Sequence, residues 1–298
     1  MSATATHRLT LPRLLAQDAI EGPPPLGVDL VPLLADAGLP ALAARLDEPA
    51  SRVLVISGDG DPTCHNNETV LRRAPRLVEE GLRQVDGVLR RSGQARPLAV
   101  AAETLAQIAL IARYGPAWFR AIGTPEVPGS VLCTVHTGAG LPQVVETAAG
   151  TPVRTLLGGS GARAARAVLL GGVTGVWLPA PRALDTRWEP RDGSARVISM
   201  LPRDRCAVAE TARVLTLAAP RCRGDVVRMV AALDDLAEPG AFDAVVRWST
   251  QAAERVDDPP THAASRLLLS ALAAFPEEFE AHAGGRCAVE PMTGIEPA

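Results

Sequence analysis

The sequence predicts an α/β protein with three successive parts, on the strength of three observations. Between residues 28 and 128, short apolar runs rich in β-branched residues alternate with stretches of helical apolar spacing, which is the order expected of an open α/β layer. Residues 129–180 contain several short strand-like runs around one short helix. Over residues 202–287 apolar residues recur about every 3.6 residues, which is typical of a helical bundle.

The N-terminal elements follow in order. Residues 1–27 end in a proline cluster, EGPPPLG, and are predicted to be a flexible lead-in because proline removes backbone donors. Two short helices are expected next, with the second beginning at Pro40. The runs RVLVIS (52–57) and PLAVAA (97–102) have the composition of buried parallel strands. The helical stretch between them is interrupted at Pro75.

The remaining elements are less regular until the bundle begins. Residues 129–180 are predicted to form a compact β-rich unit, and residues 179–193, rich in proline and charge, a connecting loop. The run ARVISML (195–201) is predicted as a strand that returns to the first sheet. Four helical stretches between 206 and 283 are expected to form the bundle, and residues 288–298 a tail.

Composition limits the class of protein. The chain of 298 residues carries 30 basic and 33 acidic residues, a formal net charge of −3, so it lacks the basic excess with which proteins bind a phosphate backbone. All of the basic residues are arginine, because the chain contains no lysine. Schiff-base catalysis and phosphate loops that need a lysine are therefore excluded, and nucleic acid is not expected as a partner.

Targeting and redox signals predict a cytoplasmic protein. No run reaches the roughly 18 apolar residues of a membrane span, and the N-terminus contains no signal-peptide core. Membrane insertion is therefore not expected. The five cysteines are odd in number and widely spaced, which favours free thiols over a disulfide framework.

An acidic turn follows the first predicted strand. Its residues are Asp59, Gly60, Asp61 and Pro62. Two interpretations are open: the carboxylates form the polar floor of a nucleotide pocket, or they satisfy backbone donors in an ordinary strand-to-helix turn. Cys64 and His65 come next, and a metal or nucleophilic site there is disfavoured because adjacent residues in a turn rarely point at one spot.

Two further positions carry polar groups of interest. Glu103 and Thr104 begin the helix after the second predicted strand, where they either contact a bound cofactor or cap the helix. His282 lies four residues after Glu278 on the last predicted helix, and a local pair between these two side chains is expected.

Three stretches of the chain resemble, in the same order, the flavoprotein subunit (51-kDa type) of respiratory NADH dehydrogenase, or complex I, and its actinobacterial-like paralogues. They are AAETLAQIALIARYGPAWFRAIGTPEVPGSVLCTV, AVLLGGVTGVWLP and CAVAETARVL. The resemblance covers roughly residues 28–287. It implies a Rossmann-like flavin domain over 28–128, an inserted ubiquitin-like β-grasp module of the soluble-ligand-binding type over 129–180, and a C-terminal helical bundle over 202–287.

The resemblance also implies a cofactor set, FMN and a [4Fe-4S] cluster, with hydride taken from NADH onto the flavin. The family's glycine-rich flavin loop corresponds to Gly38–Arg45, and its asparagine pair before Glu-Thr is replaced by Ala101-Ala102. The positions that retain family character imply cofactor-binding roles for Asp59, Gly60, Asp61, Pro62, Glu103 and Thr104.

Of the family's cluster cysteines, one is retained. Cys222 corresponds to the first ligand, whereas Asp225 and Arg228 stand at the next two ligand positions. A cubane cluster needs four thiolates or close substitutes. Cys206 matches a family cysteine that is not usually a ligand, so the resemblance implies Cys222 as the single retained metal ligand.

Two functions are compatible with these residues. The sequence favours a diverged homologue that acts as an accessory or scaffold component of an electron-transfer system, with degenerate FMN and [4Fe-4S] sites, because the losses fall on the glycine loop, the amides and the thiolates. The alternative is an active NADH-dependent oxidoreductase subunit that passes electrons from NADH through FMN to an iron–sulfur partner. The expected partners are a ferredoxin-like or other electron-transfer subunit and NAD(H).

Overall fold

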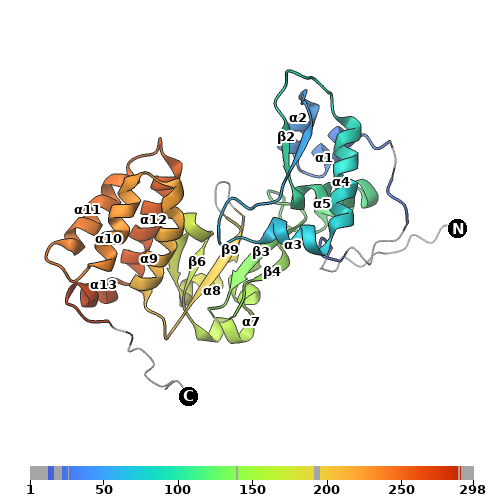
Figure 1. Ribbon diagram of the computed structural model, residues 1–298. Helices are drawn as coiled ribbons and strands as arrows, with labels where there is room; N and C mark the ends of the chain where they lie inside the picture. Colours follow the sequence, from blue (N-terminus) through green and yellow to red (C-terminus); the bar gives the residue numbers. More distant parts are fainter. Residues whose placement is uncertain are drawn as a thin grey trace, which may run out of the picture.

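The computed structural model describes residues 13–16, 22–25, 27–138, 140–190, 195–287 and 289. Figure 1 shows a central sheet with a group of C-terminal helices on one side and a smaller helix-and-strand unit on the other. The fold is therefore of the mixed α/β class that the sequence predicts. The predicted tail, 288–298, lies outside the described residues except for Val289.

The N-terminal unit is a two-stranded parallel sheet with helices packed around it. Strand β1 (Val53–Ile56) pairs in parallel with β2 (Leu98–Ala101). The helices are α1 (Leu30–Asp36), α2 (Pro40–Asp47), α3 (Asn66–Arg73), α4 (Pro75–Val88), α5 (Ala102–Tyr114) and α6 (Pro116–Arg120). Proline begins α2, α4 and α6, where its missing N–H has no helical partner to lose. Pro75 consequently divides the helical stretch into α3 and α4.

Strand β1 is exposed, so the prediction of burial on both faces is wrong. Leu54, Val55 and Ile56 have 40%, 37% and 42% of their surface exposed, whereas Leu98 and Val100 of β2 are buried. Burial on both faces requires a parallel strand to lie inside a sheet with layers on each side. This sheet has two strands, and β1 is an edge strand.

The central sheet has five strands in the order β4-β3-β9-β6-β7. Their bounds are β3 (Ser130–His136), β4 (Gln143–Ala148), β6 (Ala165–Leu170), β7 (Val176–Pro179) and β9 (Val197–Pro202). The first strand, β3, is parallel to the last, β9, and the other pairs are antiparallel. Helix α7 (Val153–Ala164) follows the first hairpin. This is the strand order of a ubiquitin-like β-grasp module.

Two sequence predictions fail in this region. The run 195–201 does not return to the first sheet, because β9 pairs with β3 and β6. Residues 179–193 contain α8 (Ala180–Asp185) and β8 (Arg187–Trp188), and β8 pairs with β5 (Thr151–Pro152). Burial explains both outcomes, since Val197 and Ile198 are fully buried and Trp188 is 5% exposed. These side chains complete the core of the β-grasp module.

The C-terminal part is the predicted helical bundle. Its helices are α9 (Ala207–Ala218), α10 (Gly224–Asp234), α11 (Ala241–Ala253), α12 (Pro259–Ala274) and α13 (Pro276–Ala283). The last predicted helix is divided because Pro276 begins a new one. Trp177 of β7 meets Phe275 edge to face, with ring centroids 5.8 Å apart, and the bundle thereby packs on the β-grasp sheet. Within the described part of the chain, no helix is long and apolar enough to cross a membrane.

Part of the predicted lead-in is anchored in the fold. Leu14 and Leu15 are buried, and the backbone N–H groups of residues 13–15 donate to the carboxylate of Glu146 on β4 at 2.6–3.3 Å. The Ser130 hydroxyl donates to the same carboxylate at 2.6 Å. The prediction of flexibility is therefore wrong for residues 13–15, because the half-buried carboxylate of Glu146 accepts hydrogen bonds from their backbone N–H groups.

Glu146→Ala tests this anchor. Because the substitution leaves several amide donors without an acceptor, we expect the free energy of unfolding to fall by about 1–3 kcal/mol and hydrogen exchange at residues 13–15 to accelerate. Glu79→Ala, at an exposed position of α4, is the control and should change neither measurement. Unaltered exchange at residues 13–15 in Glu146→Ala would show that Glu146 does not hold this segment.

Candidate functional site

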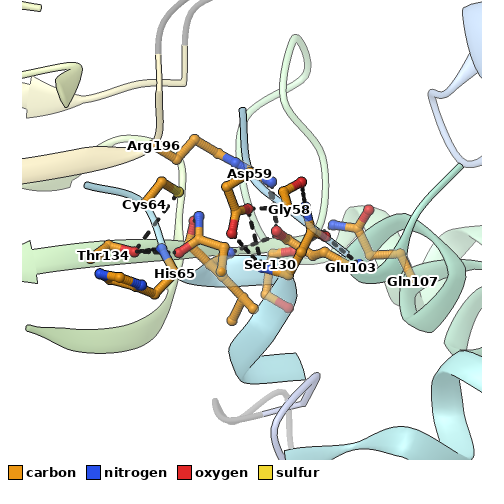
Figure 2. Close-up of polar contacts among 12 residues, drawn as sticks. Gly58, Asp59, Cys64, His65, Glu103, Gln107, Ser130, Thr134 and Arg196 are labelled. Carbon is orange, nitrogen blue, oxygen red and sulfur yellow. Dashed lines mark hydrogen bonds and ion pairs between the residues drawn. The ribbon is translucent and has the colours of Figure 1, made fainter. Parts of the chain in front are cut away.

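Polar side chains from distant parts of the sequence converge where the turn after β1, the start of α5 and strand β3 meet (Figure 2). The turn contributes Gly58 and Asp59, α5 contributes Glu103, and the residue before β9 contributes Arg196. The site therefore lies between the N-terminal unit and the β-grasp module. It includes two of the six residues predicted to bind a cofactor, with Asp61 close by in the same turn.

A buried ion pair occupies the centre of this network. The carboxylate of Glu103, which is 1% exposed, accepts two hydrogen bonds from Arg196: Nη1 to Oε1 at 2.9 Å and Nη2 to Oε2 at 2.5 Å. The backbone N–H of Leu132 donates to the same carboxylate at 2.8 Å. Burial raises the pKa of Glu103, and the charge of Arg196 and the Leu132 hydrogen bond oppose that rise. Both oxygens of Glu103 are thus committed to protein donors.

Asn67 joins the acidic turn to helix α5. Its Oδ1 accepts from the backbone N–H of Glu103 at 3.0 Å, and its Nδ2 donates to the carbonyl of Gly58 at 3.2 Å and to Asp59 Oδ1 at 3.0 Å. The interpretation of Glu103 as a helix cap is wrong, because Asn67 accepts from its backbone N–H while the Glu103 carboxylate binds Leu132 and Arg196. Thr104 is half-buried in the first turn of α5.

Asp59 is also held by the backbone of Asn67. Both of its carboxylate oxygens accept from the backbone N–H of Asn67, at 3.1 and 3.0 Å. Burial raises the pKa of Asp59, and the Asn67 hydrogen bond acts in the opposite direction. Gly60 and Pro62 stand exposed on the turn, with Gly60 at φ +72°, a conformation that glycine adopts without strain.

Asp61 connects the turn to the β-grasp module. Its Oδ1 accepts from the N–H and the hydroxyl of Thr63 at 2.8 and 2.5 Å, and its Oδ2 accepts from the N–H of Val173 at 2.9 Å. A Cβ at Gly172 would lie 2.4 Å from Oδ2, so the carboxylate approaches this closely because residue 172 is glycine. The interpretation in which the acidic turn satisfies backbone donors is confirmed for Asp59 and Asp61.

A second set of contacts surrounds Thr134 of β3. Its hydroxyl accepts from the N–H of His65 at 2.9 Å and donates to Asn66 Oδ1 at 2.9 Å. The Sγ atom of Cys64 lies 3.9 Å from that hydroxyl, and burial raises the pKa of this thiol to about 11. A thiol with so high a pKa is protonated at neutral pH and is a poor nucleophile. The disfavoured interpretation of Cys64 as a nucleophile therefore gains no support.

A hollow of about 490 Å³ opens beside this network. Its lining residues are Ser57, Gly58, Asp59, Cys64, Glu68, Leu71 and Arg72. Of the residues predicted to bind a cofactor, Asp59 alone is in this lining. Asp61 and Glu103 are 7% and 1% exposed and engaged elsewhere.

The stretch that corresponds to the family's flavin loop does not fit FMN in the family's manner. Gly38 has φ +85°, and a Cβ there would lie 2.9 Å from Pro128 Cγ, so this glycine serves packing. Helix α2 begins two residues later, at Pro40. Arg45 donates to the carbonyl of Ala99 at 2.7 Å. Helix α2 thus occupies most of the stretch that corresponds to the family's glycine-rich sequence.

Cys222 likewise does not fit a [4Fe-4S] cluster. Its Sγ donates to the carbonyl of Ala218 at 3.3 Å, and Asp225, at the next family ligand position, is paired with Arg255. Among the described residues, one group of three side chains brings its ligand atoms close enough together to bind a metal ion. Cys222 is not part of that group. A cluster bound by thiolates needs four ligands. All five cysteines are free, as their spacing predicts.

Comparison of the sequence with known proteins finds a short match. No family model matches the chain. A segment is 38% identical over 73 residues to the NAD-reducing hydrogenase HoxS subunit alpha of Cupriavidus necator, which is 24% of this chain and 12% of that subunit. The chain thus matches about an eighth of the length of this curated relative.

The fold is similar to that of chains in two crystal structures of an NAD+-reducing [NiFe]-hydrogenase. In the air-oxidized state the TM-score is 0.73 at 18% identity, covering 97% of this chain and 69% of that chain. In the H2-reduced state it is 0.68 at 18% identity, covering 85% and 62%. At this level of identity the similarity establishes the architecture, and function must be argued from the residues.

Sequence reasoning missed Asn67 and Arg196, which organise the network. Asn67 stands in the first turn of α3, in NNET, where an asparagine has the composition of an ordinary helix start. Arg196 adjoins an apolar strand, and its partner is 93 residues away in the chain. In the sequence, Arg196 is a charged residue at the edge of an apolar run. That position alone does not identify Glu103 as its partner.

Arg196→Met tests the buried ion pair. Glu103 would keep its burial and lose its counter-charge, so we expect the free energy of unfolding to fall by about 3–5 kcal/mol at neutral pH. With the folded-state pKa of Glu103 raised further, the lost stability should return as pH falls, because protonation removes the unpaired charge. Chemical denaturation at several pH values measures both effects.

Two further variants make this test specific. Glu103→Gln combined with Arg196→Met removes both charges and should be less destabilised than Arg196→Met alone. Arg203→Met, at an exposed site just after β9, should leave stability nearly unchanged. Equal losses in the single and double variants would mean that Arg196 stabilises the protein by packing and not by its charge.

Proposed function

We propose that this protein is a diverged homologue of the NADH dehydrogenase flavoprotein subunit, acting as an accessory or scaffold component of an electron-transfer system without its own FMN or [4Fe-4S] cluster. One observation carries the proposal: the acidic groups at the family's cofactor positions are engaged in internal contacts. Glu103 binds Arg196 and Leu132, and Asp61 binds Thr63 and Val173. The fold shared with chains of an NAD+-reducing hydrogenase supports the class of system.

The energetics of these contacts favour a structural role for the acidic groups. A cofactor that recruited the Glu103 carboxylate would take it from Arg196 and leave a guanidinium in a mostly buried position without its partner. Breaking a buried pair in this way costs about 3–5 kcal/mol. Asp61 would likewise release the Val173 N–H, which is buried. Cofactor binding at these residues would therefore work against the stability of the fold.

The same contacts support a scaffold role. Asp61 ties the turn after β1 to the β-grasp module, and Glu103 ties α5 to the segment that enters β9. The two units are thereby connected through charged, geometrically specific hydrogen bonds. A platform of this kind suits assembly with another electron-transfer subunit, such as a ferredoxin-like protein.

The cofactor content of the purified protein tests the proposal directly. Protein prepared without oxygen should show no flavin absorption and no broad iron–sulfur absorption, and assays of the same sample should find neither iron nor flavin in stoichiometric amount. Cys222→Ser should leave the spectrum unchanged and alter stability little. Stoichiometric flavin, or iron whose absorption disappears in Cys222→Ser, would refute the proposal and establish a redox subunit.

The alternative, an NADH-dependent subunit, rests on the hollow that contains Asp59 and Arg72. A carboxylate suits ribose hydroxyls and a guanidinium suits a phosphate. If NADH binds there, Arg72→Gln should weaken binding about tenfold, a change of about 1.4 kcal/mol, measured by titration calorimetry. Arg73→Gln, on the same helix and also exposed, is the matched control. Absence of NADH binding by the unaltered protein would eliminate this alternative.

A further inference from the structure

Three potential metal ligands come together at one end of the helical bundle. Cys206 immediately precedes α9, His282 lies in the last turn of α13, and Cys287 follows α13. The Sγ atom of Cys206 is 3.2 Å from Nε2 of His282. All three ligand atoms lie within 4.8 Å of one another. Figure 1 shows α13 beside the lower part of α9, so residues far apart in the sequence meet here.

The donor set selects the class of metal. Two sulfur atoms and one imidazole nitrogen form the ligand combination typical of zinc, whereas magnesium and calcium take oxygen ligands. In a tetrahedral site with Zn–S bonds of about 2.3 Å and Zn–N bonds of about 2.1 Å, a sulfur and a nitrogen ligand lie about 3.6 Å apart and two sulfur ligands about 3.8 Å apart. The Cys206–His282 separation is 3.2 Å, so a small outward shift of these side chains would admit the ion. We propose that Cys206, His282 and Cys287 bind a divalent zinc-type ion.

Burial raises the pKa of the Cys206 thiol to about 11, so a bound metal ion would have to displace the proton of this thiol. Its Sγ accepts a hydrogen bond from the backbone N–H of Ala209 at 3.4 Å, as the N-cap of α9. The N-terminus of a helix stabilises negative charge, and a thiolate is the form of cysteine that binds metals. Serine, threonine or aspartate is the usual residue at such a cap. A cysteine at this cap, beside a histidine and a second cysteine, therefore supports metal binding.

Glu278 does not account for the position of His282. The sequence predicts a local pair between these residues, but the Glu278 carboxylate accepts from the backbone N–H of Ala207 at 2.6 Å and pairs with Arg166 at 2.8 Å. The local pair is therefore replaced by other contacts, and His282 Nε2 faces Cys206 instead. Three protein ligands then leave the fourth position of a tetrahedral ion to water or to another donor.

This site is separate from the cofactor positions that the family resemblance implies. None of its three residues corresponds to a cluster ligand of the family, and Cys222, which does, is outside the group. A bound ion would connect the beginning of α9 to the chain that follows α13. Because a ligand that binds the folded state stabilises it, metal binding should raise the melting temperature.

Metal titration of the full chain tests the site. Protein freed of metal under reducing conditions should take up about one Zn2+ per chain, measured by elemental analysis after exchange into metal-free buffer. With Co2+ it should show the visible absorption of a tetrahedral site and a thiolate-to-cobalt charge-transfer band. We expect each of three single variants to weaken Zn2+ binding at least about tenfold: Cys206→Ser, His282→Gln and Cys287→Ser. Loss of a residue that only supports a metal ligand already weakens binding by about this factor.

Matched variants make the titration specific to these three ligands. Cys222→Ser removes a thiol in the same bundle and should retain full metal binding. Cys287→Ser changes an exposed residue, so its effect will not arise from misfolding, which the melting temperature without metal verifies. No retained Zn2+ in the unaltered protein, or uptake that all three variants preserve, would overturn the proposal. So would a Cys206–Cys287 disulfide that mass spectrometry finds in freshly isolated protein lacking metal.

Discussion

The buried pair between Glu103 and Arg196 is the contact on which the arrangement of the N-terminal unit and the β-grasp module depends. A carboxylate that is 1% exposed must have its charge compensated, and the bidentate guanidinium together with the Leu132 N–H does so. Those donors come from β3 and from the segment that enters β9, whereas the carboxylate comes from α5. The pair therefore sets the position of the N-terminal unit on the central sheet.

The other polar contacts extend this connection. Asn67 caps α5 and holds Asp59, and Asp61 reaches the turn at Val173. The acidic residues to which the family resemblance assigns cofactor binding accept hydrogen bonds from the protein itself. A fold can be shared while function differs, because function depends on the site and architecture on the core. The fold similarity to a hydrogenase and the proposed scaffold role are compatible for this reason.

The proposed metal ligands lie away from the cofactor positions that the family resemblance implies. The helical bundle carries the Cys206, His282 and Cys287 group, while Cys222, the residue that family resemblance singles out, bonds to a helix carbonyl. The three ligands come from the start of one helix and the end of another. The sequence contains all three side chains, but they come close together because α13 packs on α9.

The sequence by itself determined the helices, the bundle and the β-rich unit, because apolar periodicity and proline positions act locally. Pro75 and Pro276 begin helices as their geometry requires, and the acidic turn serves backbone donors as short aspartate turns do. Tertiary structure alone decided where β9 pairs, that β1 is exposed, and which donors reach Glu103. Arg196 is 93 residues from its partner. Such pairings depend on strand order and burial, which emerge only when the whole chain packs.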